Sequence, residues 1–123
     1  IAMKKFNVAG ASFRTEKIEF ILEKYYTDRS EQDNDSYFVS NQPQKYTKYP
    51  IFRTNKVQLI AEPENKHDEN AIKVLIYSVH LGYVPRNQTE EIHEELKNEN
   101  EYIAEIKEDI KNQYSIEVSI SKK

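Results

Sequence analysis

"EPENKHDENAIKV", residues 62–74, is a cluster of charged and amide side chains around one histidine that changes abruptly into a β-branched run. Pro63 has no backbone N–H to donate, so it ends the strand that precedes it. Asn65 and Asp68 bond readily to neighbouring backbone groups, as turn residues do. The run AIKVLIY, residues 71–77, is typical of a central strand. The stretch therefore predicts two strands joined by a polar turn.

Alternation of apolar and polar residues predicts further strands on both sides of this pair. They are expected at residues 5–13, 49–53, 56–63 and 80–85, and in a terminal hairpin over 102–123 that turns at 111–113. Short links between most of these segments favour antiparallel neighbours.

Two segments have apolar residues at helical spacing and are predicted to be helices. The first is TEKIEFILEKYY, residues 15–26, with Thr15 as its expected N-cap. The second, residues 86–99, follows Pro85 and is rich in acidic residues, so most of its surface should be exposed. The spaced apolar residues are Ile18, Ile21, Leu22 and Tyr25 in the first helix, and Ile92 and Leu96 in the second.

The predicted fold class is mainly β with two added helices. About six or seven short strands with short links favour a small closed or nearly closed β-barrel whose ends the helices cover. A chain of 123 residues is too short for two ordinary domains, so we expect a single domain over residues 4–121. Residues 27–36 contain no apolar side chain and are expected to be a loop.

Composition excludes several functional classes. The net charge of −3 is unlike that of a duplex binder with a basic footprint over the whole domain, so any nucleic-acid contact should be local. The absence of cysteine excludes disulfides, a thiol nucleophile and thiolate metal ligands. The longest apolar runs span only a few residues, so we expect a cytoplasmic protein without membrane contact.

Turn chemistry alone accounts for much of the stretch from Glu62 to Asn70, but two kinds of site are alternatives. A metal site would use His67 and Asp68 with Glu64 or Glu69, yet no second histidine stands at a ligand spacing. A hydrolase would pair His67 and Asp68 with a serine, yet no serine stands in a nucleophile-elbow context. We therefore expect neither an enzyme nor a bound metal or cofactor.

The text around this turn resembles the HIRAN domain family. The family pattern is a strand that ends in E-P-x-N-x-x-D-x-N-A-I-x-V, followed by G-Y-[VI]-P, and the opening FNVAGASF is similar to the first strand of the family. The matching residues are Glu62, Pro63, Asn65, Asp68, Asn70, Ala71, Ile72 and Val74, and then Gly82, Tyr83, Val84 and Pro85.

The resemblance implies an OB-like or SH3-like β-barrel with an inserted helix and loop at about residues 15–50. It implies a DNA-binding module that captures the 3′-hydroxyl end of single-stranded DNA in DNA repair or at stalled replication forks. Such modules occur fused to remodelling helicases and as free-standing bacterial proteins. A repair, helicase or phage protein is the expected protein partner.

The resemblance also implies roles for individual residues. Asn65 and Asp68 meet the terminal nucleotide, with the Asp68 carboxylate accepting a hydrogen bond from the 3′-hydroxyl. Phe13 stacks on a base, His67 occupies a second aromatic position, and Tyr83 stands where a partner for the backbone phosphate is expected.

Two departures from the family weaken the expected contacts. Ser12 stands where the family has an arginine, and His67 stands where it has a tyrosine. Weaker phosphate and stacking contacts are therefore expected at these two positions. Arg86, directly after the matched Pro85, is a further candidate for a phosphate contact, or else a cap for the following helix.

Cations alternate with aromatic rings in KYTKYPIFRTNK, residues 45–56, as stacking on single strands requires. The candidate cations for the rest of the strand are Lys45, Lys48, Arg53 and Lys56. An ordinary strand pair with an aromatic core face and a solvated cationic face explains the pattern equally well. A second functional hypothesis is a protein-interaction barrel without nucleic-acid binding, whose acidic helix over 86–99 docks onto a partner.

Overall fold

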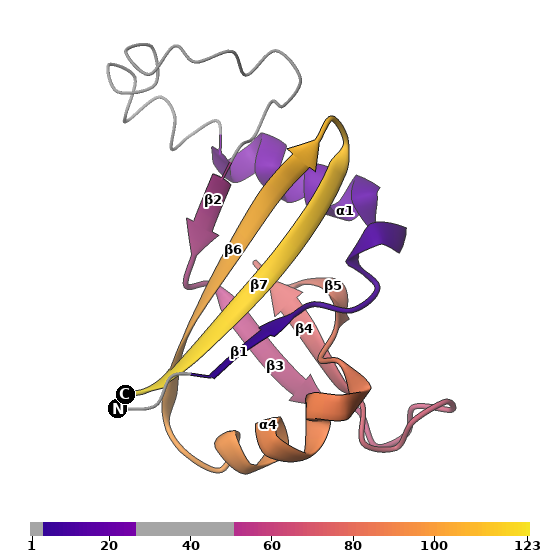
Figure 1. The fold of residues 1–123 in the computed structure, drawn as a ribbon, viewed down its shortest axis with the longest axis vertical. Coiled ribbons are helices and arrows are strands. Elements are labelled where there is room, and N and C mark those ends of the chain that lie inside the picture. Colours follow the sequence, from indigo (N-terminus) through magenta and orange to yellow (C-terminus); the bar gives the residue numbers. More distant parts are fainter. Residues whose placement is uncertain (1–3, 27–50) are drawn as a thin grey trace.

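A computed structural model describes residues 4–26 and 51–123 of the chain (Figure 1). This part contains seven strands in two antiparallel sheets together with two α-helices, so the predicted mainly β fold with two helices is confirmed. The four-stranded sheet has the order β1 (Lys4–Asn7), β7 (Gln113–Lys122), β6 (Asn100–Ile110), β2 (Ile51–Thr54). The three-stranded sheet has the order β3 (Val57–Ala61), β4 (Ile72–Ile76), β5 (Val79–Tyr83).

The hairpin of β6 and β7 runs along the long axis of the molecule (Figure 1). Alternate residues of both strands point into the core, where Ala104 pairs with Val118 and Ile106 pairs with Ile116. The two strands are joined at Asn112, whose φ of 64° is the left-handed conformation that asparagine tolerates in tight turns. The predicted terminal hairpin is confirmed.

The predicted first helix is confirmed as α1 (Thr15–Ile21), which continues as a π-helical turn, η2 (Leu22–Tyr26). Its apolar face is buried, since Ile18, Ile21 and Leu22 are fully inaccessible to solvent. The expected cap is wrong: Thr15 is the first helical residue, and its hydroxyl donates to the Ser12 carbonyl at 3.4 Å.

The second helix begins as a short 3₁₀ turn, η3 (Arg86–Gln88), and continues as α4 (Thr89–Glu95). Its buried anchor is Ile92, which is completely inaccessible, while the acidic residues of its first turn are exposed. Figure 1 shows α1 and α4 toward opposite ends of the long axis, so the two helices cover different parts of the core.

The expected closed barrel is not what the described residues form. The chain bends at Asn55 and Lys56, so that β2 pairs with β6 while β3, only two residues further on, pairs with β4. On the other side the two sheets are joined by one isolated bridge, between Ala9 and Tyr83. The molecule is therefore two sheets connected at their edges, and an OB-like or SH3-like barrel is not confirmed.

The bridge between the sheets explains why the first strand is shorter than the predicted 5–13. Ala9 and Tyr83 exchange two backbone hydrogen bonds, of 2.8 and 2.9 Å. This crossing requires glycine at position 82, because a Cβ there would lie 2.3 Å from the Ala9 carbonyl oxygen. Gly10, at a φ of 81°, then turns the chain into a 3₁₀ turn, η1 (Ala11–Phe13). The segment before α1 is thereby placed beside the end of β5.

Candidate nucleic-acid interface

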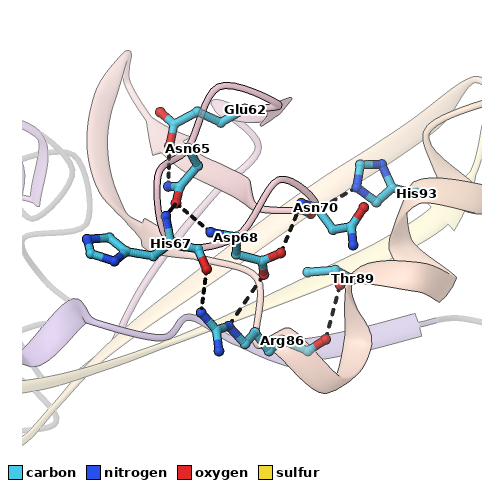
Figure 2. A network of polar contacts seen from close by, with 8 residues as sticks. All are labelled: Glu62, Asn65, His67, Asp68, Asn70, Arg86, Thr89 and His93. Atoms are coloured by element: carbon cyan, nitrogen blue, oxygen red, sulfur yellow. Dashed lines mark hydrogen bonds and ion pairs between the residues drawn. The ribbon is translucent and has the colours of Figure 1, made fainter.

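The loop between β3 and β4 is organised by the side chain of Asn65. Its amide nitrogen donates to Glu62 Oε1 at 2.7 Å, and its oxygen accepts from the backbone N–H groups of His67 and Asp68 at 2.8 and 3.0 Å. The Asp68 carboxylate continues the pattern by accepting from the backbone N–H of Asn70 at 2.9 Å. The predicted turn chemistry is confirmed, and it fixes the directions of the Asn65 and Asp68 side chains (Figure 2).

Two residues that follow β5 bind this loop from different sides (Figure 2). The Arg86 guanidinium lies 3.5 Å from Asp68 Oδ2 and donates to the His67 carbonyl at 2.9 Å. A ring nitrogen of His93, on α4, lies 2.9 Å from the Asn70 carbonyl oxygen. Figure 2 shows both side chains directed toward the loop. Of the two roles predicted for Arg86, helix capping is wrong, since its side chain reaches the loop instead.

Glu62 connects the loop to Tyr83 at the end of β5. The Tyr83 hydroxyl donates to Glu62 Oε1 at 3.0 Å, the same oxygen that Asn65 bonds, and Lys73 lies 3.6 Å from Glu62 Oε2. The hydrogen bonds from Asn65 and then Tyr83 lower the pKa of Glu62. Burial, followed by the bond to Glu62, raises the pKa of the Tyr83 hydroxyl. Tyr83 therefore remains a protonated donor to an ionised carboxylate.

The ring of Tyr83 is enclosed by two further side chains. The Arg14 guanidinium carbon lies 5.7 Å from the ring centroid, over its face. His80 packs edge-on against the same ring, with centroids 4.9 Å apart. Burial and then the charge of Arg14 lower the pKa of His80, so the neutral imidazole is favoured. Phe13, directly before Arg14, is 88% exposed.

A continuous set of contacts thus brings together several of the residues that the sequence singled out. Asn65, Asp68, Tyr83 and Arg86 are linked through Glu62 and the loop backbone. His67 belongs to the same loop, but its ring is exposed and points away from Asp68 and Arg86 (Figure 2). We call the surface formed by Phe13, Arg14, Tyr83, Arg86 and the loop of residues 62–71 the Tyr83 surface.

The described part of the predicted cationic stretch, residues 51–56, does not join the Tyr83 surface. Lys45 and Lys48 lie outside the described residues. Arg53 lies on β2 and Lys56 in the turn before β3, whereas Glu62 follows the other end of β3. At about 3.3 Å per residue, roughly 20 Å of chain separates Lys56 from Glu62. Arg53 is also engaged with Glu105 of β6, at 2.6 Å between Nε and Oε2.

Sequence reasoning missed three residues that contact Tyr83 as contributors: Glu62, Arg14 and His80. Glu62 was matched only as part of a motif, although its carboxylate is the centre of the network. Arg14 and His80 gave no signal, because only the bridge between the sheets places them against Tyr83.

The described residues show neither a metal-binding cluster nor a membrane-spanning helix. Within residues 4–26 and 51–123, no group of three or more histidine, aspartate or glutamate side chains is arranged to hold a metal ion. None of the helices in this part of the chain has the length and apolar character needed to cross a membrane.

Comparison with known proteins identifies one family. The model of the HIRAN domain matches residues 24–122, which is most of the chain. The match includes the loop of residues 62–71, Tyr83 and Arg86, while Phe13 and Arg14 precede it. No curated protein and no solved structure is significantly similar to the chain.

Proposed function

This chain belongs to the HIRAN domain family, which is a DNA-binding family, and from that premise we propose that it binds single-stranded DNA and recognises a free 3′-hydroxyl end. In this proposal the Tyr83 surface is the binding site, and the protein acts as a binding module in DNA repair or replication-fork processing, without catalysis of its own.

The observation that carries the proposal is the oriented carboxylate of Asp68. A carboxylate repels phosphate, so its presence at a DNA site is useful where a sugar hydroxyl needs an acceptor, which is at a terminal nucleotide. The side chain is 20% exposed, and its oxygens are used by the Asn70 N–H at 2.9 Å and by Arg86 at the long distance of 3.5 Å. Because an ionised carboxylate has about four acceptor sites, it can accept a further hydrogen bond.

The surroundings of Asp68 suit the rest of a nucleotide. The Phe13 ring is 88% exposed, an unusual position for a phenylalanine unless it serves as a platform for another ring. The Arg86 side chain is 73% exposed and lies beside the carboxylate, where it offsets the negative charge that would repel the strand. Lys73 likewise offsets the negative charge of Glu62.

The proposal is tested by fluorescence anisotropy with a short oligothymidylate that carries its dye at the 5′ end. Wild-type protein is expected to bind an oligonucleotide with a free 3′-hydroxyl more tightly than one with a 3′-phosphate. Asp68→Asn keeps an acceptor for the loop but removes the charge, and Asp68→Ala removes both. Each variant should reduce the preference for the hydroxyl, with Asp68→Ala abolishing it.

The matched control is Asp109→Ala, because Asp109 is an exposed acidic residue near the turn of the β6–β7 hairpin, far from the loop of residues 62–71 (Figure 1). It should bind both oligonucleotides as the wild type does. Equal affinity of the wild type for the two ends would reject 3′-end recognition. Absence of binding to either would favour the protein-interaction hypothesis.

A further inference from the structure

We propose that Arg14 binds a backbone phosphate of the DNA strand whose 3′ end lies at Asp68. This inference rests on the proposed function and adds to it a specific cationic contact on the Tyr83 surface. It concerns a residue that precedes the part of the chain matched by the family model.

The fold holds the Arg14 guanidinium in a defined place. Arg14 Nη1 donates to the Gly10 carbonyl at 2.9 Å, and the guanidinium lies over the face of Tyr83. Gly10 leaves the necessary room, because a Cβ at that position would lie 2.7 Å from Arg14 Nη1. A guanidinium that is already oriented loses less side-chain entropy when it binds a ligand than a freely moving one does.

The same guanidinium has donors to spare and no counter-ion among the described residues. No carboxylate in residues 4–26 and 51–123 lies within ion-pair distance of Arg14, whereas Arg53 is paired with Glu105 and Arg86 with Asp68. The hydrogen bond to the Gly10 carbonyl uses one of the five N–H groups of the guanidinium. A planar cation with free donors matches a phosphate, which accepts two parallel hydrogen bonds.

The two carboxylates in the contacts around Tyr83 each have a cation beside them. Lys73 lies 3.6 Å from Glu62 Oε2, and Arg86 lies 3.5 Å from Asp68 Oδ2. Among these side chains the charge left over is that of Arg14, although the loop also carries Glu64, Lys66 and Glu69 and the chain as a whole has a net charge of −3. With Phe13 exposed beside Arg14, a base and the adjoining phosphate have a ring and a cation to bind on the same segment.

The inference is tested with oligothymidylates in which one of the last three linkages is a neutral methylphosphonate. Wild-type protein should lose about tenfold in affinity when the linkage that Arg14 contacts is neutralised, the size expected for one charge-assisted hydrogen-bond pair. Arg14→Gln should lose a similar factor on the unmodified oligonucleotide and should show almost no additional loss on the modified one. The slope of log affinity against log salt should fall by about 0.7 in Arg14→Gln.

Arg14→Lys keeps the charge and separates electrostatics from folding, since it should retain the salt slope of the wild type. Lys107→Gln is the control, because Lys107 is an exposed cation of β6 that lies beside Glu105, away from the Tyr83 surface. It should leave both the affinity and the response to methylphosphonates unchanged.

The outcomes distinguish this inference from the function on which it rests. If wild type prefers the 3′-hydroxyl but Arg14→Gln remains equally sensitive to every neutral linkage, the role of Arg14 is rejected and 3′-end recognition stands. If wild type does not bind the oligonucleotide, both are rejected. If Arg14→Gln loses the sensitivity to one particular neutral linkage that the wild type shows, the result supports both the role of Arg14 and the proposed function.

Discussion

The molecule presents two surfaces where an arginine lies near a carboxylate, and they differ in what the arginine does. On the outer face of the four-stranded sheet, Arg53 is 2.6 Å from Glu105, and Lys107 lies 3.5 Å from the same residue. The bond from Arg53 lowers the pKa of Glu105, as expected for a saturated ion pair. On the Tyr83 surface, Arg86 lies 3.5 Å from Asp68 Oδ2, but Arg14 has no carboxylate partner among the described residues and donates to the Gly10 carbonyl instead.

The number of cations on a surface does not by itself identify a nucleic-acid site, because paired and unpaired cations differ in what they can bind. An arginine bound to a carboxylate contributes little net positive charge, and it must lose that partner before it can bind phosphate. A guanidinium held by a carbonyl and an aromatic face has no carboxylate partner to lose before it binds phosphate. The following predictions test this difference between the two surfaces.

The largest effect should come from Gly82→Ala, which disrupts the bridge between Ala9 and Tyr83 that positions the residues of the Tyr83 surface. The new Cβ would lie 2.3 Å from the Ala9 carbonyl oxygen, and Gly82 has a φ of 150°. We expect the free energy of unfolding to fall by about 3 kcal/mol. Urea denaturation measures the change, with Ser115→Ala, at an exposed position of β7, as a control that should change it by less than about 0.5 kcal/mol. Equal stability of the two variants would contradict this role of the bridge.

A smaller effect is expected from pH, and it should come from His80, which packs against the ring of Tyr83. Burial and then the charge of Arg14 lower the pKa of His80 below its ordinary 6.5. The hydrogen bond with the Gly82 carbonyl and then Glu62 oppose this shift, and Lys17 adds to it. The unfolded chain therefore binds a proton at this position before the folded chain does. The contribution of His80 is fully present above pH 6.5 and is lost as the pH falls below that value.

Urea unfolding of wild type and His80→Gln at pH 7.5 and pH 5.5, values bracketing the ordinary histidine pKa of about 6.5, measures this effect. The variant should show a smaller fall in the free energy of unfolding between the two conditions than the wild type does. The carboxylate of Glu105, with its lowered pKa, contributes stability that is lost only well below this window. Identical falls in the two proteins would show that His80 does not titrate as its surroundings require.

The smallest effect is expected from Arg53→Gln on the other surface. The Arg53 side chain is 66% exposed, and exposed ion pairs contribute about 0 to 1 kcal/mol. We expect the free energy of unfolding to change by less than about 0.5 kcal/mol and the affinity for single-stranded DNA by less than about twofold. Arg86→Gln, measured beside it by anisotropy, should weaken binding more strongly. A greater loss from Arg53→Gln would assign the DNA strand to the outer face of the four-stranded sheet.

The sequence predicted the elements whose pattern is local. The β6–β7 hairpin follows from strict alternation around Asn112, and the loop of residues 62–71 follows from Pro63 and the hydrogen-bonding preferences of Asn65 and Asp68. In each case the residues that determine the conformation are neighbours in the chain. Their conformation can therefore be predicted from the sequence without knowledge of the fold.

The features that the sequence did not predict depend on contacts between distant segments. The strands of residues 4–26 and 51–123 do not close into a barrel, because the bend at Asn55 and Lys56 separates β2 from β3 into different sheets. The place of Arg14 depends on the bridge from Ala9 to Tyr83. The candidate cations of residues 45–56 were close to the loop in sequence, but the length of β3 places the described ones at its other end.

The most direct test of 3′-end recognition at the Tyr83 surface is a titration of ¹⁵N-labelled protein with a short oligothymidylate, monitored through backbone amide shifts. With a free 3′-hydroxyl, we expect the largest changes in residues 62–71, Phe13, Arg14 and Tyr83, and smaller changes there when the end carries a phosphate. The amides of Arg53 and Glu105 should remain unchanged in both titrations. Changes centred on Arg53 and Glu105, or equal changes with both ends, would contradict the assignment of 3′-end recognition to the Tyr83 surface.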